Sequence, residues 1–216
     1  MTDLVSVAPF YANNRNPFNY SKFEQVSRDT VTSWLTLDEI TQQLNLFQDE
    51  SQDVYLQSLE LATRMAIEDY LGMAICSTQY RVYYGNFGLY NTSLYLDLPE
   101  VSRSTDVTID SVKVYSTSAT TATTMASSTY SYDSTGNRVI VNSLPTLSQD
   151  AANPIVVTYT QSPTQLAAYP VIKQAGLMLL THLYNNRSTV GDTVGARAEI
   201  PFGVSALLRP YKPLVL

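Results

Sequence analysis

The spacing of hydrophobic and polar residues changes twice along the chain. Apolar residues first recur every three or four positions, between residues 36 and 71, which predicts two α-helices. Thr36-Leu-Asp-Glu39 is a capping box, and the helix that it opens is expected to end near Phe47. Ser51-Gln-Asp53 opens a longer helix, which Gly72 is suited to cap.

From about residue 78 to residue 160 the period is two, which is typical of β-strands. The predicted strands are Gln79–Tyr84, Ser93–Leu98, Val107–Tyr115, Arg138–Asn142 and Ile155–Thr160. Asp133-Ser-Thr-Gly-Asn137 predicts a hairpin turn between residues 130–132 and 138–141. The Ser/Thr-rich stretch 116–129 predicts a mobile loop.

Helical spacing returns at Pro170, which suits the first turn of a helix, and continues to Asn185; a short helical turn is expected at Val204–Leu208. We therefore expect an α+β fold: a helical bundle formed by helices from both ends of the chain, with an inserted small antiparallel β unit and extended N- and C-terminal arms. The expected boundaries are 1–34 for the N-terminal arm, 35–77 and 161–208 for the helical core, 78–160 for the β unit with its Ser/Thr-rich loop, and 209–216 for the C-terminal tail.

Composition and charge exclude several classes of function. The chain has one cysteine, Cys76, and one histidine, His182, so we expect no internal disulfide and no Cys/His zinc site. The sequence starts without the features of a signal peptide and contains no run of about 18 apolar residues, so we expect no membrane partner. The net charge of −6 disfavours binding to duplex DNA through its phosphates.

No pattern of residues indicates catalysis. The Gly-rich phosphate-binding motifs are missing from the sequence, and Glu68 and Asp69 are adjacent on a helix, so they point about 100° apart and form no carboxylate pair. His182 lies in a mostly apolar helix and Cys76 in an apolar stretch, and both are expected to pack. We predict that the chain is not an enzyme, with no catalytic, cofactor-binding or metal-binding residues.

Charge is unevenly distributed between the two ends of the chain. Residues 36–70 contain eight acids and one base, a net charge of −7, whereas residues 171–216 contain five bases and two acids, a net charge of +3. This polarity arises either from chance or from head-to-tail packing between copies. The candidates for contacts between copies are Asp49, Glu50, Asp53, Glu60, Lys173, Arg187 and Arg197.

Five motifs, taken in order, resemble those of a known family. They are Leu35-Thr-Leu-Asp-Glu-Ile40, Ala66-Ile-Glu-Asp-Tyr-Leu-Gly72, Tyr169-Pro-Val-Ile-Lys-Gln-Ala175, His182-Leu-Tyr-Asn-Asn-Arg187 and Ile200-Pro-Phe-Gly-Val-Ser-Ala-Leu-Leu-Arg-Pro-Tyr211. Over residues 35–216 the chain resembles the head–tail connector (adaptor) proteins of tailed bacteriophages.

The resemblance implies a structural role in the neck of a virion. Such adaptors form a ring, usually of twelve copies, beneath the portal protein, and packaged DNA passes through the ring without specific binding. The implied partners are the portal, other copies of the chain, and a tail or stopper (nozzle) protein. The implied location is the head–tail interface, with the host cytoplasm as the place of assembly.

The same resemblance implies that the last eight residues dock on the portal. The prolines among them disfavour a helix, so we expect an extended peptide with an apolar end. The docking residues are Arg209, Pro210, Tyr211, Lys212, Pro213, Leu214, Val215 and Leu216.

Two other classes of function remain as alternatives to the adaptor. The β unit might be a binding module for tail fibres or for a host-surface glycan, because its strands carry Tyr80, Tyr83, Tyr84 and Tyr95; such rows more often pack a sheet. A wall-degrading hydrolase would need a cleft with spaced carboxylates, for which the sequence gives no indication.

Overall fold

A computed structural model describes residues 19–46, 50–85, 94–99, 101, 106–116, 121–162, 167–187 and 201–212. The chain divides into two compact units. Unit 1 consists of Met1–Glu24, Tyr80–Pro99 and Ile109–Tyr159, and unit 2 of Gln25–Gln79, Glu100–Thr108 and Thr160–Leu216.

The described residues form helices and strands in the following order. The α-helices are α2 (Leu37–Leu44), α3 (Asp53–Leu71), α5 (Pro170–Asn185) and α6 (Phe202–Leu208). Short 3-10 helices are η2 (Glu50–Gln52), η4 (Ser127–Thr129) and η5 (Arg209–Tyr211). The strands are β1 (Lys22–Arg28), β2 (Thr78–Tyr84), β3 (Leu94–Asp97), β4 (Val107–Val114), β5 (Thr123–Thr124), β6 (Tyr130–Asp133), β7 (Arg138–Val141) and β8 (Ile155–Gln161).

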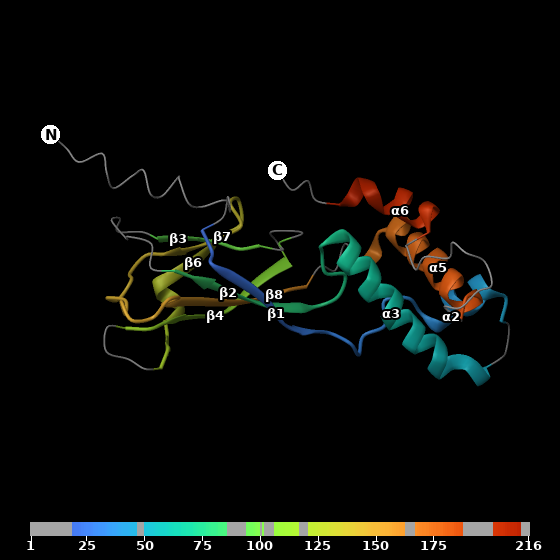
Figure 1. Cartoon of the computed structure of the whole chain (residues 1–216), viewed down its shortest axis with the longest axis horizontal. Coiled ribbons are helices and arrows are strands. Elements are labelled where there is room, and N and C mark those ends of the chain that lie inside the picture. The colour runs from blue at the N-terminus through green and yellow to red at the C-terminus, as the bar shows by residue number, and fades with distance from the viewer. Residues whose placement is uncertain are drawn as a thin grey trace. The chain divides into compact units, whose positions relative to one another are not determined.

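The strands form two sheets. The larger sheet has the order β1-β2-β8-β4-β5, and the smaller has the order β3-β7-β6 (Figure 1). In the smaller sheet β7 pairs antiparallel with both neighbours, so that Val141 lies opposite Leu94 on one side and Tyr130 on the other. The predicted β6–β7 hairpin is confirmed, and Asn137 in its turn has a φ of 49°, a left-handed conformation that asparagine tolerates well.

The core of unit 1 is formed by alternating residues of the strands. β2 alternates between buried and half-buried positions, and β8, at the centre of its sheet, is buried at nearly every position. The ring of Tyr80 lies 5.4 Å from that of Phe23 and 5.5 Å from that of Tyr159, distances typical of interacting aromatic pairs. Tyrosine rings therefore fill much of this interior.

The core of unit 2 brings together two parts of the sequence that are far apart. Helices α2 and α3 pack against α5 and α6, as Figure 1 shows, and the cluster contains Leu56 and Ile67 from the first part and Ile172, Leu180 and Val204 from the second. The expected packing of helices from both ends of the sequence is thus confirmed. No helix in the described part of the chain is long and apolar enough to cross a membrane.

The predicted fold class, a helical bundle with a small inserted β unit, is wrong. The two sheets are a major part of the fold, and the larger includes two strands that the pattern did not indicate: β1, from the expected N-terminal arm, and β5, from the expected mobile loop. β1 was not predicted because it is an edge strand. Its residues are mostly exposed, so apolar and polar residues need not alternate along it. Residues 1–18 of the expected arm lie outside the described residues.

The first helix also ends earlier than predicted. α2 stops at Leu44, and Asn45 follows in a left-handed conformation with a φ of 56°. Its capping box forms as expected, because Thr36 Oγ1 accepts a hydrogen bond from Glu39 N at 3.2 Å and Glu39 Oε2 accepts one from Thr36 N at 2.9 Å.

Candidate assembly surfaces and the buried network that shapes them

Helix α3 carries three buried charged residues on one face. Glu60, Arg64 and Glu68 are each four residues apart, and their exposed fractions are 3%, 0% and 2%. Buried charges are unfavourable unless they are paired and hydrogen-bonded, so each should have a specific partner. All three bind the backbone of neighbouring segments.

Glu60 holds the segment that leads into α2. Its Oε1 accepts hydrogen bonds from the backbone N–H groups of Trp34, at 3.0 Å, and Leu35, at 3.3 Å. Burial raises the pKa of the Glu60 carboxyl above its usual value, and these two hydrogen bonds oppose the shift. The Trp34 indole is held in turn, because its Nε1 donates to Ala167 O at 2.9 Å.

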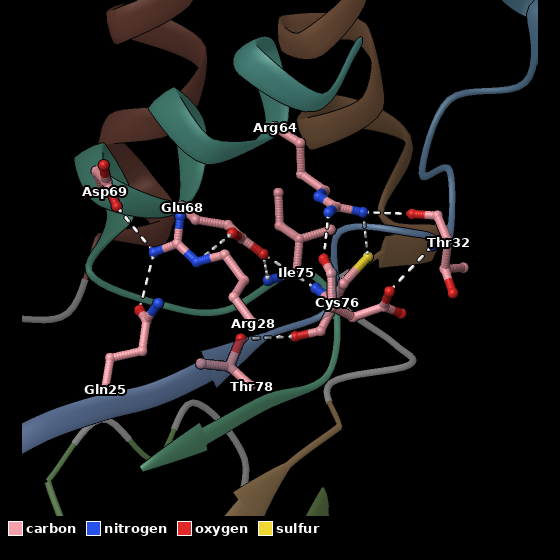
Figure 2. A network of polar contacts seen from close by, with 10 residues as sticks. Gln25, Arg28, Thr32, Arg64, Glu68, Asp69, Ile75, Cys76 and Thr78 are labelled. Atoms are coloured by element: carbon pink, nitrogen blue, oxygen red, sulfur yellow. Dashed lines mark hydrogen bonds and ion pairs between the residues drawn. The ribbon is translucent and has the colours of Figure 1, made fainter. Parts of the chain in front are cut away.

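Arg64 occupies the centre of the network (Figure 2). Its guanidinium donates to the backbone oxygens of Asp29 and Thr32, and its Nη1 lies 3.1 Å from Cys76 Sγ. Burial raises the pKa of the Cys76 thiol, so the cysteine stays protonated at neutral pH. Cys76 is half-buried and forms no disulfide.

Glu68 ties the end of α3 to the chain that follows it. Its Oε1 accepts from the backbone N–H groups of Ile75, at 2.7 Å, and Cys76, at 3.0 Å. Arg28 joins the network, with its Nε 3.3 Å from Glu68 Oε2 and its Nη2 3.0 Å from Asp69 Oδ1 (Figure 2). The face of α3 thus anchors the segments on both sides of the helix in sequence.

Asp29 completes the local fold of residues 29–33. Its Oδ1 accepts hydrogen bonds from the backbone N–H groups of Val31, at 2.9 Å, and Thr32, at 3.0 Å. Hydrogen bonds from Thr32 and Val31 lower the pKa of this carboxyl to about 2. Together with Arg64, Asp29 therefore fixes the backbone of this segment from two sides.

A groove of about 340 Å³ lies between this fixed segment and α3. Residues 30–33 form one wall and Val54, Gln57, Ser58, Glu60 and Leu61 form the other. Val31 and Val54 are 91% and 80% exposed, which is unusual for valine. The groove thus has two exposed apolar side chains, Val31 and Val54, in a lining of mostly polar residues.

The segment Pro201–Lys212 packs on unit 2 through one side only. Val204 and Leu208 are buried, whereas Phe202 is 87% exposed and Ala206 and Arg209 are exposed as well. Positions four and seven residues after Phe202 lie on the same helical face, opposite the buried one. This exposed face of Phe202, Ala206 and Arg209 is called the α6 face below.

The first half of the expected extended tail is folded. Arg209–Tyr211 is a 3-10 helix that continues α6, and Pro210 is accommodated in its first turn, where no N–H donor is needed. The ring of Tyr211 lies 5.8 Å from that of Tyr169, and Lys212 Nζ lies 5.0 Å from the ring centre of Tyr70. The expectation of an extended peptide is therefore wrong for residues 209–211, whereas the backbone of Lys212 is extended; Pro213–Leu216 lie outside the described residues.

The predicted candidates for contacts between copies fall into four groups. Glu50 is exposed and Asp53 half-exposed near the start of α3, whereas Glu60 is buried and so does not face a neighbouring copy. Lys173 pairs within the chain with Glu39, at 2.6 Å. Asp49 and Arg197 lie outside the described part of the chain.

Arg187 has partners within the chain as well. Its guanidinium carbon lies 4.7 Å from the ring centre of Tyr55 and 4.5 Å from that of Tyr184, and its Nη2 donates to Gln52 Oε1 at 2.9 Å. His182, which we expected to be packed, is exposed beside Asn186. Among the described residues no three His, Cys, Asp or Glu side chains gather as a metal site would require.

The tyrosines of the β-strands do not form an open row. Tyr80 and Tyr84 are buried, Tyr83 donates to Glu24 Oε1 at 2.6 Å, and Tyr95 alone of these four is largely exposed, at 47%. Tyr80 and Tyr84 fill the sheet interior, so the four rings do not form the open row on which the glycan-binding alternative relied.

Sequence reasoning missed the network on α3. Glu60 was taken as a candidate for contacts between copies, and Arg64 was counted only in a charge balance, although opposite charges four residues apart on the face of Leu56 and Ile67 indicate buried, paired groups. That spacing is the signal that would have identified them.

Solved structures with a similar fold come from gene transfer agent (GTA) particles. A chain in the neck of an empty GTA particle, computed with C6 symmetry, has a TM-score of 0.60 and 20% sequence identity over 91% of this chain and 97% of that chain. A chain in the virion of a native GTA particle has a TM-score of 0.61 and 18% identity, with the same coverage. A chain in the neck of a native GTA particle, computed with C12 symmetry, has a TM-score of 0.60 and 18% identity, again with that coverage.

No family model matches the sequence, and no curated protein matches it either. At this level of identity the structural likeness establishes the fold and leaves function to be argued separately. Across both of its units, the chain therefore has the same fold as chains found in the neck and virion structures of GTA particles.

Proposed function

We propose that this chain is a structural protein of the neck of a phage-like particle: a head–tail adaptor that forms a ring beneath the portal. The observation that carries the proposal is the shared fold with neck chains over 91% of the sequence. The ordered motifs that resemble phage adaptors support it independently. The role needs no catalysis.

The ring is proposed to contain twelve copies, and packaged DNA is proposed to pass through it. Symmetric C6 and C12 necks among the structural relatives support a ring of this order. Closed rings use two different, complementary surfaces on each copy. An acidic chain, with its net charge of −6, repels phosphate and so favours free passage of DNA.

Docking on the portal is proposed for the segment Arg209–Leu216. Tyr211 and Lys212 anchor its start to unit 2, so the apolar end, Leu214-Val-Leu216, begins from a fixed point. Burial of each of these side chains contributes about 1.5–3 kcal/mol, and ordering each residue costs about 1–2 kcal/mol. One segment is marginal, whereas the segments of a whole ring act together.

A deletion of Pro213–Leu216 tests the docking proposal, because it leaves the described contacts of Tyr211 and Lys212 in place. The truncated and full-length chains are each mixed with the purified portal of the same particle, and bound copies are counted by native mass spectrometry. Full-length chain should bind as a ring and truncated chain should stay folded and unbound. Portal binding by the truncated chain would refute the docking role, and a virion map with the chain outside the neck would refute the adaptor.

A further inference from the structure

The α6 face is an exposed surface without partners in the described part of its own chain. Among the described residues, Phe202 stacks on no other ring and the Arg209 side chain forms no ion pair or hydrogen bond. Residues 201–212 contain two bases, Arg209 and Lys212, and no acid. The surface thus combines a large apolar side chain with positive charge.

The groove beside α3 has the complementary character. Beside the groove, at the start of α3, lie two acids that are not buried, Glu50 and Asp53, and residues 50–61 contain no base. The rim offers the exposed side chains of Val31 and Val54, and the network of hydrogen bonds described above keeps its walls in place. A volume of about 340 Å³ lies in the range of cavities that take up a ligand or a large side chain.

These two surfaces lie apart within unit 2. In Figure 1, α6 follows the upper edge of the group of helices, whereas the N-terminal half of α3, in cyan, lies at its lower edge. The α6 face of a copy is therefore not positioned to fill the groove of that same copy. Two complementary surfaces at different places on one chain are what a head-to-tail ring requires.

We infer that the α6 face of one copy docks into the groove of a second copy of this chain. Phe202 packs against Val31 and Val54, and Arg209 lies beside the acidic first turns of α3. The apolar contact supplies most of the affinity and the charges fix the orientation. This inference rests on the proposed ring. It assigns Arg209 to the contact between copies. The docking on the portal is then left to the residues that follow Lys212.

Single charge substitutions on the two surfaces test the contact. Phe202→Glu and Val54→Glu alter side chains that are 87% and 80% exposed, so both variants should fold. Fluorescence of Trp34, the single tryptophan, checks the fold of unit 2. Each variant should weaken ring formation on purified portal by about tenfold or more in concentration, the scale of a hot-spot loss. Gln174→Glu, an exposed change of equal charge on α5, should leave it unchanged.

A charge exchange sharpens the test. Arg209→Glu should weaken ring formation, and adding Asp53→Arg to the same chain should restore it at least in part, because the attraction is recreated with the signs reversed. Rings of Phe202→Glu and Val54→Glu that form as readily as wild-type rings would refute this contact and leave the adaptor role standing. If wild-type chain formed no ring on the portal, the proposed function itself would fail.

Discussion

The hydrogen bonds that Glu60 accepts make a sharp prediction about stability. Glu60→Ala removes the acceptor for the backbone N–H groups of Trp34 and Leu35, both in residues that are at most 5% exposed. Glu60→Gln keeps one oxygen acceptor, removes the charge and replaces the second oxygen by an NH2 group. Comparison of the two variants therefore separates the contribution of the hydrogen bonds to the free energy of unfolding from the contribution of the charge.

The expected magnitudes follow from the two groups left without an acceptor. Each buried N–H without a partner costs about 1–3 kcal/mol, and some of this is offset because a desolvated carboxylate is also removed. We expect Glu60→Ala to lower the free energy of unfolding by about 2–4 kcal/mol, which lowers the melting temperature by about 5–12 °C for a chain of this size. Because burial raises the pKa of Glu60, its charge is unfavourable, and Glu60→Gln should cost less than about 1 kcal/mol.

The fluorescence of Trp34 reports on unfolding at this site. Its indole lies next to the affected backbone and is the single tryptophan of the chain, so its fluorescence follows unfolding of unit 2. Thermal melts of wild type, Glu60→Ala and Glu60→Gln are compared at pH 7. A Glu60→Ala melt within 2 °C of wild type, or equal losses in both variants, would refute the reasoning.

Three further predictions concern other contacts of unit 2. Asp29 has a pKa of about 2, below its usual value, so its contribution to stability should be lost as the pH falls from about 4 to about 2, and urea titrations of Asp29→Asn should lack this loss. Gly176→Ala should lower stability by about 1–2 kcal/mol despite the better helix propensity of alanine, since the new methyl group would lie 2.6 Å from Trp34 Cη2; an unchanged melting temperature would contradict this. Lys173→Ala should change stability by less than about 1 kcal/mol in urea titrations, because its ion pair with Glu39 is partly exposed, and a larger loss would show the pair to be stronger.

Local signals in the sequence predicted many of the elements. The Thr36–Glu39 capping box, the β6–β7 hairpin and the buried strand β8 each depend on short-range chemistry or on a run of residues with one environment. Such features can be read directly because their cause lies within about ten residues.

The elements that were missed depend on distant neighbours. β1 is a strand because its backbone pairs with β2, and its own side chains are mostly exposed. The pairing is flanked by bonds from Ser21 N to Tyr83 O and from Asp29 N to Ser77 O, each 2.8 Å. Pro210 was taken to disfavour a helix. In the structure it lies in the first turn of the 3-10 helix η5, which continues α6, and a proline is tolerated at that position. The fold class failed for this reason: strands without an apolar period were assigned to arms and loops.

The groove could not be predicted from the sequence, although the charged residues that hold its wall can be found there. Its wall is a loop, and loops with exposed apolar residues ordinarily adjust to a partner at an entropic cost. Here Glu60 and Arg64, two buried charges of α3, bind that loop from within, and Asp29 holds it from its own start. A hydrophobic contact would leave the loop free to slide, whereas hydrogen bonds to named backbone atoms fix its conformation. If a second copy docks in the groove as proposed, a wall that is already held in place loses little entropy on docking. A small contact would then suffice in the proposed ring, where every copy makes the contact twice.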